Sequence, residues 1–359
     1  MIKMSINLGE RSYPIYIATN YADIGKSIAS ARLSGKMVLI TDTNVDMHQA
    51  DECINALKES GYDVHKYVIA AGEENKNLDT VNEIYRYLVK QKLERNSVLI
   101  ALGGGVVGDI TGFVAATFLR GINFVQVPTT LIAQADSSVG GKVGVDFEGS
   151  KNIIGAFYQP RLVYINVNSL KTLPKREVQA GLAEVVKHGI IKDRDFFDYV
   201  EYNLNKIFEF KEDVLQFTAR ANCSIKGSVV EEDEREGGLR AILNFGHTIG
   251  HAVESVSGFQ LLHGECVSIG MVGAFKMAQH LGMVDAKESD RVIGLLERIG
   301  LPTGIKGMDV DKVFAQMYHD KKIKNNKLVF ILPKRIGEVL QISIDDTALI
   351  KEVLQELAQ

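Results

Sequence analysis

Three histidines lie close together in the second half of the chain, at a spacing that suits a metal site. His247 and His251 are four residues apart, which places both imidazoles on one face of a helix, and His263 follows after a short loop. Imidazoles and carboxylates bind divalent cations such as zinc, and three protein ligands leave one position open for a substrate. A single core histidine is usually structural, but this cluster favours a metal centre. The spacing leaves the third ligand open among His247, His251, His263, Glu184 and Glu265.

A second candidate site is the glycine-rich segment 102–109, which lies between an expected buried strand and an expected buried helix. Glycines let the backbone approach a ligand closely, and a helix N-terminus offers N–H groups to an anion. Gly103, Gly105 and Gly108 match the spacing of dinucleotide folds. The usual fingerprint follows the first strand and has an acid about 20 residues later, and this segment has neither feature. Phosphate binding is favoured over a purely structural turn.

Further polar residues interrupt apolar segments. Asp42 ends an apolar run, where it is equally suited to accept hydrogen bonds from a ribose or to cap the next helix. The segments 136–142 and 149–152 combine glycines and lysines, which suits a second anion site better than a solvated loop. Glu184 and Lys187 lie three residues apart inside an apolar helical segment. Residues 231–236 are expected to form a solvated run of charges, and Arg120 reads as an ordinary surface arginine.

The composition excludes several classes of protein. The chain has 359 residues, 46% hydrophobic and 24% charged, with a net charge of −4, so nucleic acid is not an expected partner. No apolar run is long enough to span a membrane, and residues 1–7 alternate rather than forming a signal peptide. The three cysteines form no C-x-x-C pair, which favours the cytoplasm.

Hydrophobic periodicity predicts two domains. Strands are expected at 12–17, 37–41, 64–69, 97–101, 123–127, 143–147 and 162–165, alternating with helices at 21–31, 45–60 and 78–93. This alternation predicts a Rossmann-like α/β domain with a parallel sheet over residues 1–168, binding ligands at the carboxyl ends of its strands. Residues 169–359 are expected to form a mainly α-helical domain, with a late hairpin of 327–332 and 339–344 and a terminal helix from 346.

Taken together, the motifs resemble the 3-dehydroquinate synthase family of sugar-phosphate cyclases, over essentially the whole chain. They are GGGVVGD, VPTTLIAQADSSVGGKVGVD, AGLAEVVKHG, EREGGLRAILNFGHTIGHAVE, HGE and HDKK. The resemblance implies an NAD-binding domain and a helical metal- and substrate-binding domain, with Zn²⁺ or Co²⁺, in a cytoplasmic homodimer.

The resemblance also implies roles for individual residues. The metal ligands would be Glu184, His247 and His263. The NAD⁺ contacts would be Asp42, Glu73, Lys76, Gly103, Gly104, Gly105, Val106, Gly108, Asp109, Thr129, Thr130, Lys142 and Lys151. The substrate would meet Asp136, Lys142, Asn152, Lys187, Lys226, Arg240, Asn244, His251 and Lys327. Arg120 would reach the substrate phosphate of the neighbouring subunit. This role differs from the interpretation of Arg120 as an ordinary surface residue.

The implied reaction converts 3-deoxy-D-arabino-heptulosonate 7-phosphate to 3-dehydroquinate and phosphate. NAD⁺ oxidises the C5 hydroxyl, which the metal polarises, phosphate is eliminated, the hydride returns, and an aldol closure forms the ring. The alternatives are another sugar-phosphate cyclase, a metal-dependent polyol or glycerol-phosphate dehydrogenase, and a non-catalytic NAD-binding protein.

Overall fold

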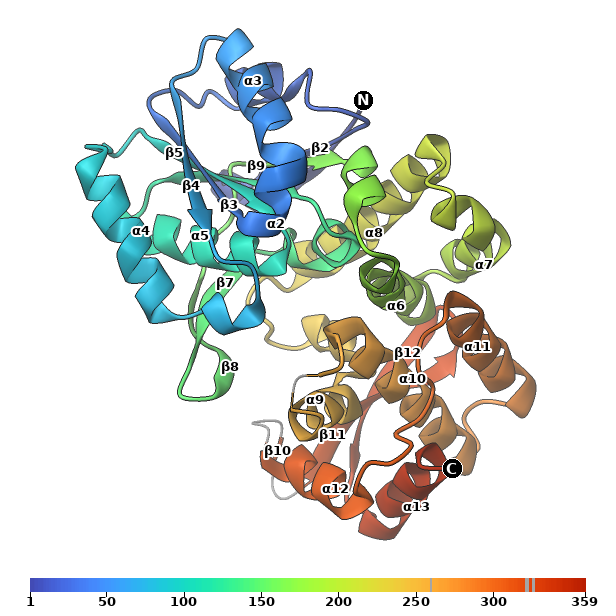
Figure 1. Cartoon of the computed structure of the whole chain (residues 1–359). Coiled ribbons are helices and arrows are strands. Elements are labelled where there is room, and N and C mark those ends of the chain that lie inside the picture. The colour runs from blue at the N-terminus through green and yellow to red at the C-terminus, as the bar shows by residue number, and fades with distance from the viewer. Residues whose placement is uncertain (259, 320–322, 325–326) are drawn as a thin grey trace. The chain divides into compact units, whose positions relative to one another are not determined.

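The computed structural model describes residues 1–258, 260–319, 323–324 and 327–359 (Figure 1). The chain forms two compact units. The first unit contains Met1–Leu173 and Glu209–Glu231, and the second contains Pro174–Phe208 and Glu232–Gln359. Helix α8 (Glu212–Glu232) belongs mainly to the first unit, where the Glu231 carboxylate accepts a hydrogen bond from the Asn7 backbone and Asn168 donates to Glu212. The units are therefore not two consecutive segments, and the division at residue 168 into two functional domains stays a prediction.

The first unit is built on a seven-stranded sheet in the order β1-β2-β9-β6-β5-β3-β4. Every neighbouring pair is parallel except β1 and β2. The strands are β1 (Ile2–Ile6), β2 (Tyr13–Ala18), β3 (Met37–Asp42), β4 (Val64–Ile69), β5 (Val98–Gly103), β6 (Asn123–Pro128) and β9 (Leu162–Asn166). The central strands β3, β5, β6 and β9 are mainly apolar and almost entirely buried, because helices cover both faces of the sheet. The predicted Rossmann-like α/β fold is confirmed.

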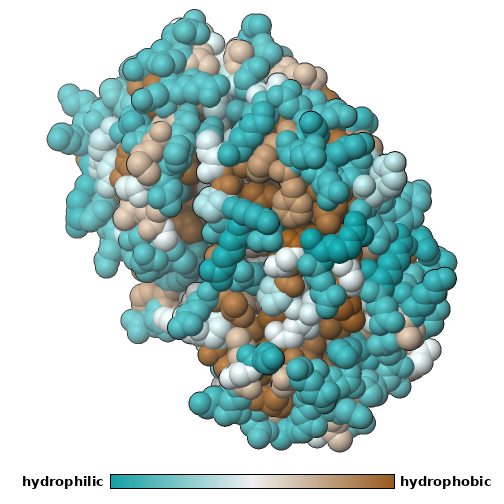
Figure 2. Space-filling model, turned by 45° about the vertical axis from the view of Figure 1, so that its right-hand side comes forward, coloured by the Kyte–Doolittle hydropathy of each residue, from teal (hydrophilic) through white to brown (hydrophobic). Residues whose placement is uncertain are grey.

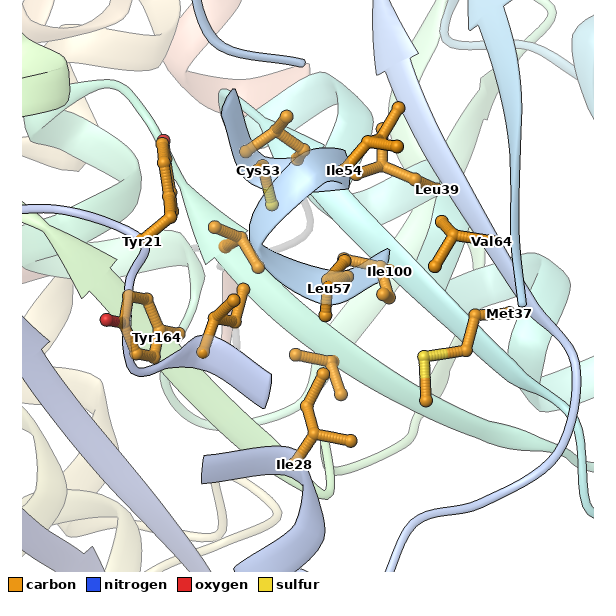
Figure 3. Packing of buried hydrophobic residues seen from close by; sticks show 14 of the residues in the cluster. Tyr21, Ile28, Met37, Leu39, Cys53, Ile54, Leu57, Val64, Ile100 and Tyr164 are labelled. Atoms are coloured by element: carbon orange, nitrogen blue, oxygen red, sulfur yellow. The ribbon is translucent and has the colours of Figure 1, made fainter. Parts of the chain in front are cut away.

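Alternate residues of β3 lie in different cores. Met37 and Leu39 pack with Cys53 and Leu57 beneath α1 (Ile24–Ser30) and α3 (Asp51–Glu59), as Figure 3 shows. Val38 and Ile40 belong to the opposite core, together with residues of α4 (Leu78–Lys90) and α5 (Gly105–Thr117). The two-residue period of a strand thus anchors a helical layer on each side of the sheet.

Strand order gives the position of the ligand edge. In chain order the parallel strands β3, β4, β5, β6 and β9 lie in space as β4-β3-β5-β6-β9. The direction of winding therefore changes between β3 and β5, and such a switch point is where open α/β sheets bind ligands. This order explains why the glycine-rich segment follows β5, a later parallel strand, rather than the first.

A hairpin of β7 (Lys142–Phe147) and β8 (Ser150–Phe157) completes the strands of the first unit. Residues 150–152 begin β8, so the alternative of a solvated loop at 149–152 does not hold for them, and the favoured anion site there stays a prediction. Lys151 and Asn152 have low strand propensity, and they lie where the register with β7 shifts, between the pairs Val145–Ile154 and Phe147–Ser150.

The second unit is mainly helical, as predicted. Its helices are α6 (Lys175–Lys192), α7 (Arg194–Phe208), α9 (His247–Val256), α10 (His263–His280), α11 (Ala286–Ile299), α12 (Val310–His319) and α13 (Thr347–Leu357). The late hairpin is confirmed as β11 (Lys327–Arg335) and β12 (Glu338–Ile344), with β10 (Ile323–Lys324) beside β11.

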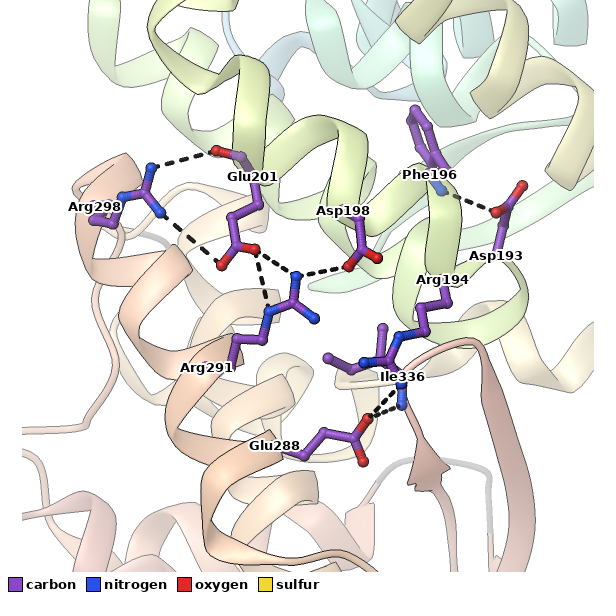
Figure 4. Close-up of polar contacts among 9 residues, drawn as sticks. All are labelled: Asp193, Arg194, Phe196, Asp198, Glu201, Glu288, Arg291, Arg298 and Ile336. Atoms are coloured by element: carbon purple, nitrogen blue, oxygen red, sulfur yellow. Dashed lines mark hydrogen bonds and ion pairs between the residues drawn. The ribbon is translucent and has the colours of Figure 1, made fainter.

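Ion pairs connect α11 to α7, and a hydrogen bond connects α11 to the hairpin (Figure 4). Arg291 of α11 contacts Asp198 and Glu201 of α7 at 2.6 and 2.5 Å. Glu288 accepts a hydrogen bond from the backbone N–H of Ile336 at 3.0 Å. These contacts join α11 to α7 and to the turn between β11 and β12.

The surface face drawn in Figure 2 is mainly hydrophilic, with apolar residues in separate patches. Among the described residues, no helix combines the length and hydropathy that crossing a membrane would need.

Candidate active site

Three helices of the second unit each direct one ligand-type side chain to a common point. Glu184 comes from α6, His247 from the start of α9 and His263 from the start of α10. His263 Nε2 lies 3.5 Å from Glu184 Oε1, and His247 Nε2 lies 3.8 Å from the same oxygen. Their ligand atoms all fall within 4.8 Å of one another. The geometry therefore selects one triad from the five candidates that spacing left open.

Close helix packing makes this convergence possible. A Cβ atom on Gly264 would lie 1.9 Å from the Ala180 carbonyl oxygen of α6, and one on Gly270 would lie 1.7 Å from the Gly246 carbonyl oxygen. Both distances exclude any side chain, so glycine is required where α10 meets α6 and the start of α9. Ala180 is one helical turn before Glu184, so the contact fixes the height of that carboxylate against His263.

Each imidazole of the triad has a partner on its other nitrogen. His247 Nδ1 lies 3.0 Å from the Phe245 carbonyl oxygen, which can only accept, so Nδ1 carries the proton. His263 Nδ1 lies 3.7 Å from Glu254 Oε2. Both arrangements direct an Nε2 lone pair toward Glu184. Glu184 Oε1 is buried and accepts no hydrogen bond from any described residue, so this donor set fits a divalent cation.

The charges around the triad are strongly coupled. Burial alone would raise the pKa of Glu184, but Lys187, His263 and His247 together hold it well below its usual range. Burial and Lys187 hold the pKa of His247 well below its usual value. Burial lowers the pKa of His263, but the carboxylates of Glu184 and Glu254 outweigh it and raise the pKa to about 9. Without a cation, a proton on His263 therefore occupies part of the place that a cation would take.

Lys187 is the most unusual charged group of α6. Every residue from 180 to 191 is buried, and Lys187 and Glu184 are each only 1% exposed. Lys187 Nζ contacts Glu184 Oε2 one turn away. A buried ion pair is a poor source of stability, so its presence in the central helix indicates a functional site.

The other histidine-segment candidates divide into two groups. His251 lies beside the triad, with its ring 5.1 Å from that of His247 and 6.1 Å from that of His263. Glu265 is directed elsewhere, because both of its oxygens accept hydrogen bonds of 2.7 Å from Arg176. It also accepts a bond from the Leu262 backbone N–H, so it acts as a cap of α10 and not as part of the triad.

Arg240 and Asn244 lie on a turn that the sequence did not reveal. Asp233 accepts hydrogen bonds from the backbone N–H groups of Gly237, Gly238 and Arg240, at 2.7, 2.7 and 3.0 Å. These bonds lower the pKa of Asp233. The buried Arg240 donates from Nη1 to the Glu234 carbonyl oxygen, and Asn244 Nδ2 donates to Glu236 at 2.9 Å. Part of the expected run of solvated charges at 231–236 thus belongs to a hydrogen-bonded turn, which Asp233 closes.

In the first unit, the predicted nucleotide contacts follow neighbouring strands at one edge of the sheet. Glu73 and Lys76 follow β4, Asp42 ends β3, Gly103 ends β5, and Thr129 and Thr130 follow β6. These four strands are adjacent in the order β4-β3-β5-β6, so the residues form a continuous row along the carboxyl edge. The row includes the switch point between β3 and β5.

The glycine turn is constrained by space. β5 ends at Gly103 and α5 begins at Gly105, with Gly104 as an N-cap that supplies no side-chain hydrogen bond. Gly103, Gly104 and Gly105 have ordinary negative φ values within the described backbone, but a Cβ atom on Gly103 would lie 2.6 Å from the Val107 side chain. The N-cap residue therefore places no side chain on the first N–H groups of α5, and the binding of an anion there stays a prediction.

Asp42 caps the next helix. Its Oδ1 accepts hydrogen bonds from the backbone N–H groups of Asn44 and Val45, at 2.9 and 3.0 Å. Both bonds go to a single oxygen of the carboxylate. The capping interpretation is therefore correct, and a ribose contact stays a prediction.

Lys76 connects several predicted contacts of the first unit. Its ammonium lies 2.6 Å from Asp109 Oδ2 and 2.5 Å from Asn152 Oδ1. Burial opposes its charge, but Asp109 and Glu73 raise the pKa of Lys76. Asp146 accepts a 2.7 Å hydrogen bond from the Asn152 backbone N–H, which supports the left-handed φ of 52° at Asn152. No motif or spacing in the sequence predicted this role of Asp146.

The remaining candidates of the first unit are dispersed. Lys226 of α8 contacts Asp136 Oδ1 at 2.9 Å, Lys142 is exposed at the start of β7, and Lys151 lies 3.4 Å from Glu73. Arg120 is exposed in a 3-10 turn (Phe118–Arg120) between α5 and β6. Lys327 begins β11, but its side chain lies outside the described part of the chain.

Comparison with known proteins agrees with this arrangement. The N-terminal domain of 3-dehydroquinate synthase matches residues 66–180, and the C-terminal domain matches residues 181–323. A 3-dehydroquinate synthase of Acetivibrio thermocellus is 68% identical over 100% of both chains. Among solved structures, a 2-deoxy-scyllo-inosose synthase complexed with carbaglucose-6-phosphate, NAD⁺ and Co²⁺ is 28% identical, covers 99% of each chain and has a TM-score of 0.91. The 2-epi-5-epi-valiolone synthase of Streptomyces hygroscopicus, with NAD⁺ and Zn²⁺ bound, is 27% identical over 98% of each chain, with a TM-score of 0.90. The chain therefore belongs to the 3-dehydroquinate synthase family of enzymes.

Proposed function

We propose that the enzyme is a phosphorus–oxygen lyase that converts 3-deoxy-D-arabino-heptulosonate 7-phosphate to 3-dehydroquinate and phosphate. The observation that carries the proposal is the triad of Glu184, His247 and His263 beside the buried Lys187. A hydroxyl oxygen at the open position of such a triad would meet a Lewis acid and a fixed ammonium group together. The 68% identity to a 3-dehydroquinate synthase favours this reaction over that of another cyclase.

The proposed cofactors are NAD⁺ and one Zn²⁺ or Co²⁺ ion, as in the two cyclase structures. When bound, they supply a reversible hydride acceptor and a Lewis acid for the C5 hydroxyl. Glu184, His247 and His263 would hold the cation, and the carboxyl-edge row from Asp42 to Thr130 would hold the dinucleotide. The amino end of α5 suits its pyrophosphate because backbone N–H groups and the helix dipole both favour an anion.

The chain's own groups suit the remaining tasks. Lys187, Arg240 and Lys226 are buried cations, which bind carboxylate and phosphate strongly because water does not screen them. Asn152, Asn244, Asp136, Lys142 and Lys327 would complete the contacts to the substrate. His251, whose ring lies 5.1 Å from that of His247, would move the hydroxyl proton during oxidation and reduction.

We also propose that the enzyme acts as a homodimer. β6 begins at Asn123, paired with Val98 at the start of β5, so Arg120 lies near the amino ends of these strands. The nucleotide row lies at the opposite edge, so Arg120 would serve a neighbouring subunit. The cytoplasm is the proposed location, because the three cysteines are buried and form no disulfide.

The deciding assay supplies the heptulosonate phosphate, NAD⁺ and Zn²⁺ or Co²⁺, and follows phosphate, dehydroquinate and NADH. We expect phosphate and dehydroquinate in equal amounts without net NADH, because the hydride returns in every turnover. A sugar phosphate without a carboxylate serves as the control substrate. Stoichiometric NADH would indicate a polyol dehydrogenase, and turnover of the control substrate alone would indicate another cyclase.

A further inference from the structure

His263 lies between two carboxylates, one on each ring nitrogen. Glu184 Oε1 is 3.5 Å from Nε2, and Glu254 Oε2 is 3.7 Å from Nδ1. Glu254 is 5% exposed and comes from the last turn of α9. His247, His251 and Glu254 occupy positions i, i+4 and i+7 of that helix, so they share one face. None of the roles assigned above uses Glu254.

Two sets of potential ligands therefore share His263. One set is Glu184, His247 and His263, and the other is His251, Glu254 and His263. A neutral imidazole carries a proton on one nitrogen and a lone pair on the other. One ring can therefore bind a cation on one side only, and the opposite side must donate its N–H.

The Nε2 side is the better cation site. The Phe245 carbonyl fixes the His247 proton on Nδ1, so two Nε2 lone pairs face Glu184 Oε1. The Nδ1–H of His263 is then directed at Glu254. His263 is the first residue of α10 and its side chain is 35% exposed, so packing alone holds the ring weakly.

We infer that Glu254 is a positioning residue that accepts the Nδ1–H of His263, orients its ring and strengthens its binding to the cation. The inference rests on the proposed function for the presence of that cation. A carboxylate behind a ligating imidazole fixes the tautomer and increases the basicity of the ligand nitrogen. Glu254 acts through His263 and does not touch the substrate.

The test measures metal affinity without turnover. Metal-stripped full-length protein is titrated with Co²⁺, and its visible absorption reports both affinity and ligand geometry. We expect Glu254→Ala to weaken Co²⁺ binding by about 10–100-fold and to alter the spectrum. Glu254→Gln, whose amide oxygen still accepts a hydrogen bond, should lose less. NAD⁺ binding should stay unchanged in both variants, which shows that they still fold.

Asp63→Asn is the matched control, because Asp63 also lies beside a histidine, with its Oδ1 3.5 Å from His65 Nε2, and both residues belong to the first unit. It should bind Co²⁺ like the unmodified protein. Unchanged affinity and spectrum in Glu254→Ala, with Co²⁺ lost in Glu184→Gln, would overturn the inference alone. Loss in Glu254→Ala with retention in Glu184→Gln would place the cation on the Nδ1 side and also overturn it. No Co²⁺ binding by the unmodified protein would reject the proposed metal site itself.

Discussion

His263 is the histidine of the candidate site whose pKa is raised by its neighbours. Its imidazole lies within ion-pair distance of two buried carboxylates, which together raise its pKa to about 9 against the effect of burial. The ring is therefore charged at neutral pH when no cation is present. Neighbouring His247 has the opposite tendency, since burial and Lys187 favour its neutral form. The two histidines should titrate in separate pH ranges.

This difference predicts a pH dependence of stability for the metal-free protein. A raised pKa in the folded state stabilises the fold fully below the unfolded value of about 6.5 and loses that contribution as pH rises through about 9. We expect the free energy of unfolding to fall between these values, and His263→Ala to remove that slope. Chemical denaturation of stripped protein from pH 6 to 10 measures it. Identical slopes in both proteins would contradict the assignment.

The same titration affects cation binding. Because the cation must displace the His263 proton, the affinity of the unmodified protein should increase as pH rises toward about 9.

Sequence spacing identified the residue types of the candidate metal site but not which residues lie together in it. Glu265 and Glu184 were equally acceptable by spacing, and only the Arg176 contact removed Glu265. Glu254 could have been predicted, because it lies seven residues after His247 and so shares one face of the helix with it. Asp233 precedes the Gly237-Gly238 pair, but its three backbone contacts depend on turn geometry that no spacing shows.

Among the elements, α10 depends most directly on glycine. Its contacts with α6 and with the backbone before α9 leave no room for a Cβ atom at Gly264 or Gly270. The candidate ligands Glu184 and His263 come from the two helices that meet at Gly264. A change that separates these helices should therefore weaken both the stability of the protein and its metal binding.

Two glycine-to-alanine changes separate this effect from ordinary helix propensity. Gly264→Ala would place Cβ 1.9 Å from the Ala180 carbonyl oxygen, and should destabilise the protein by about 3 kcal/mol or more and weaken Co²⁺ binding. Gly294→Ala in α11 meets nothing within 4 Å, and should stabilise it by about 0.5–1 kcal/mol. Urea denaturation measures both. Equal stability of the two variants would show that α10 can move away without loss.

Periodicity predicted the parallel strands well because most of them are largely apolar runs between turn residues. β4 was expected at 64–69 and observed at Val64–Ile69. β8 was missed because its residues are mostly polar, small or exposed, and its pairing with β7 is a tertiary effect. Local pattern thus identifies buried strands, while exposed hairpins depend on their partners.

At the scale of the whole molecule, each compact unit contains two segments that are separated in the sequence. α8 returns to the first unit, where Lys226 contacts Asp136, so that unit depends on a segment more than 30 residues beyond its sheet. Periodicity could not predict this, because a helix carries no signal for which body it packs against. Local sequence patterns do not predict oligomeric state either, and Arg120 illustrates why. Its exposure and unremarkable surroundings match a surface arginine, and only its place at the amino edge of the sheet argues that it serves a second copy.

Mixed dimers test that role of Arg120. Arg120→Ala and His263→Ala should each be inactive alone, since one lacks the phosphate contact and the other a metal ligand. If Arg120 acts on the neighbouring subunit, a mixed dimer has one complete site, formed by the His263 of one copy and the Arg120 of the other. Random reassembly of equal amounts should then recover roughly a quarter of the unmodified activity, because half of the dimers are mixed and each has one working site. If Arg120 acts within its own subunit, no mixed dimer contains a complete site and activity stays absent. Mixing His263→Ala with Glu184→Gln is the control, because both changes damage the same triad and neither arrangement can restore it.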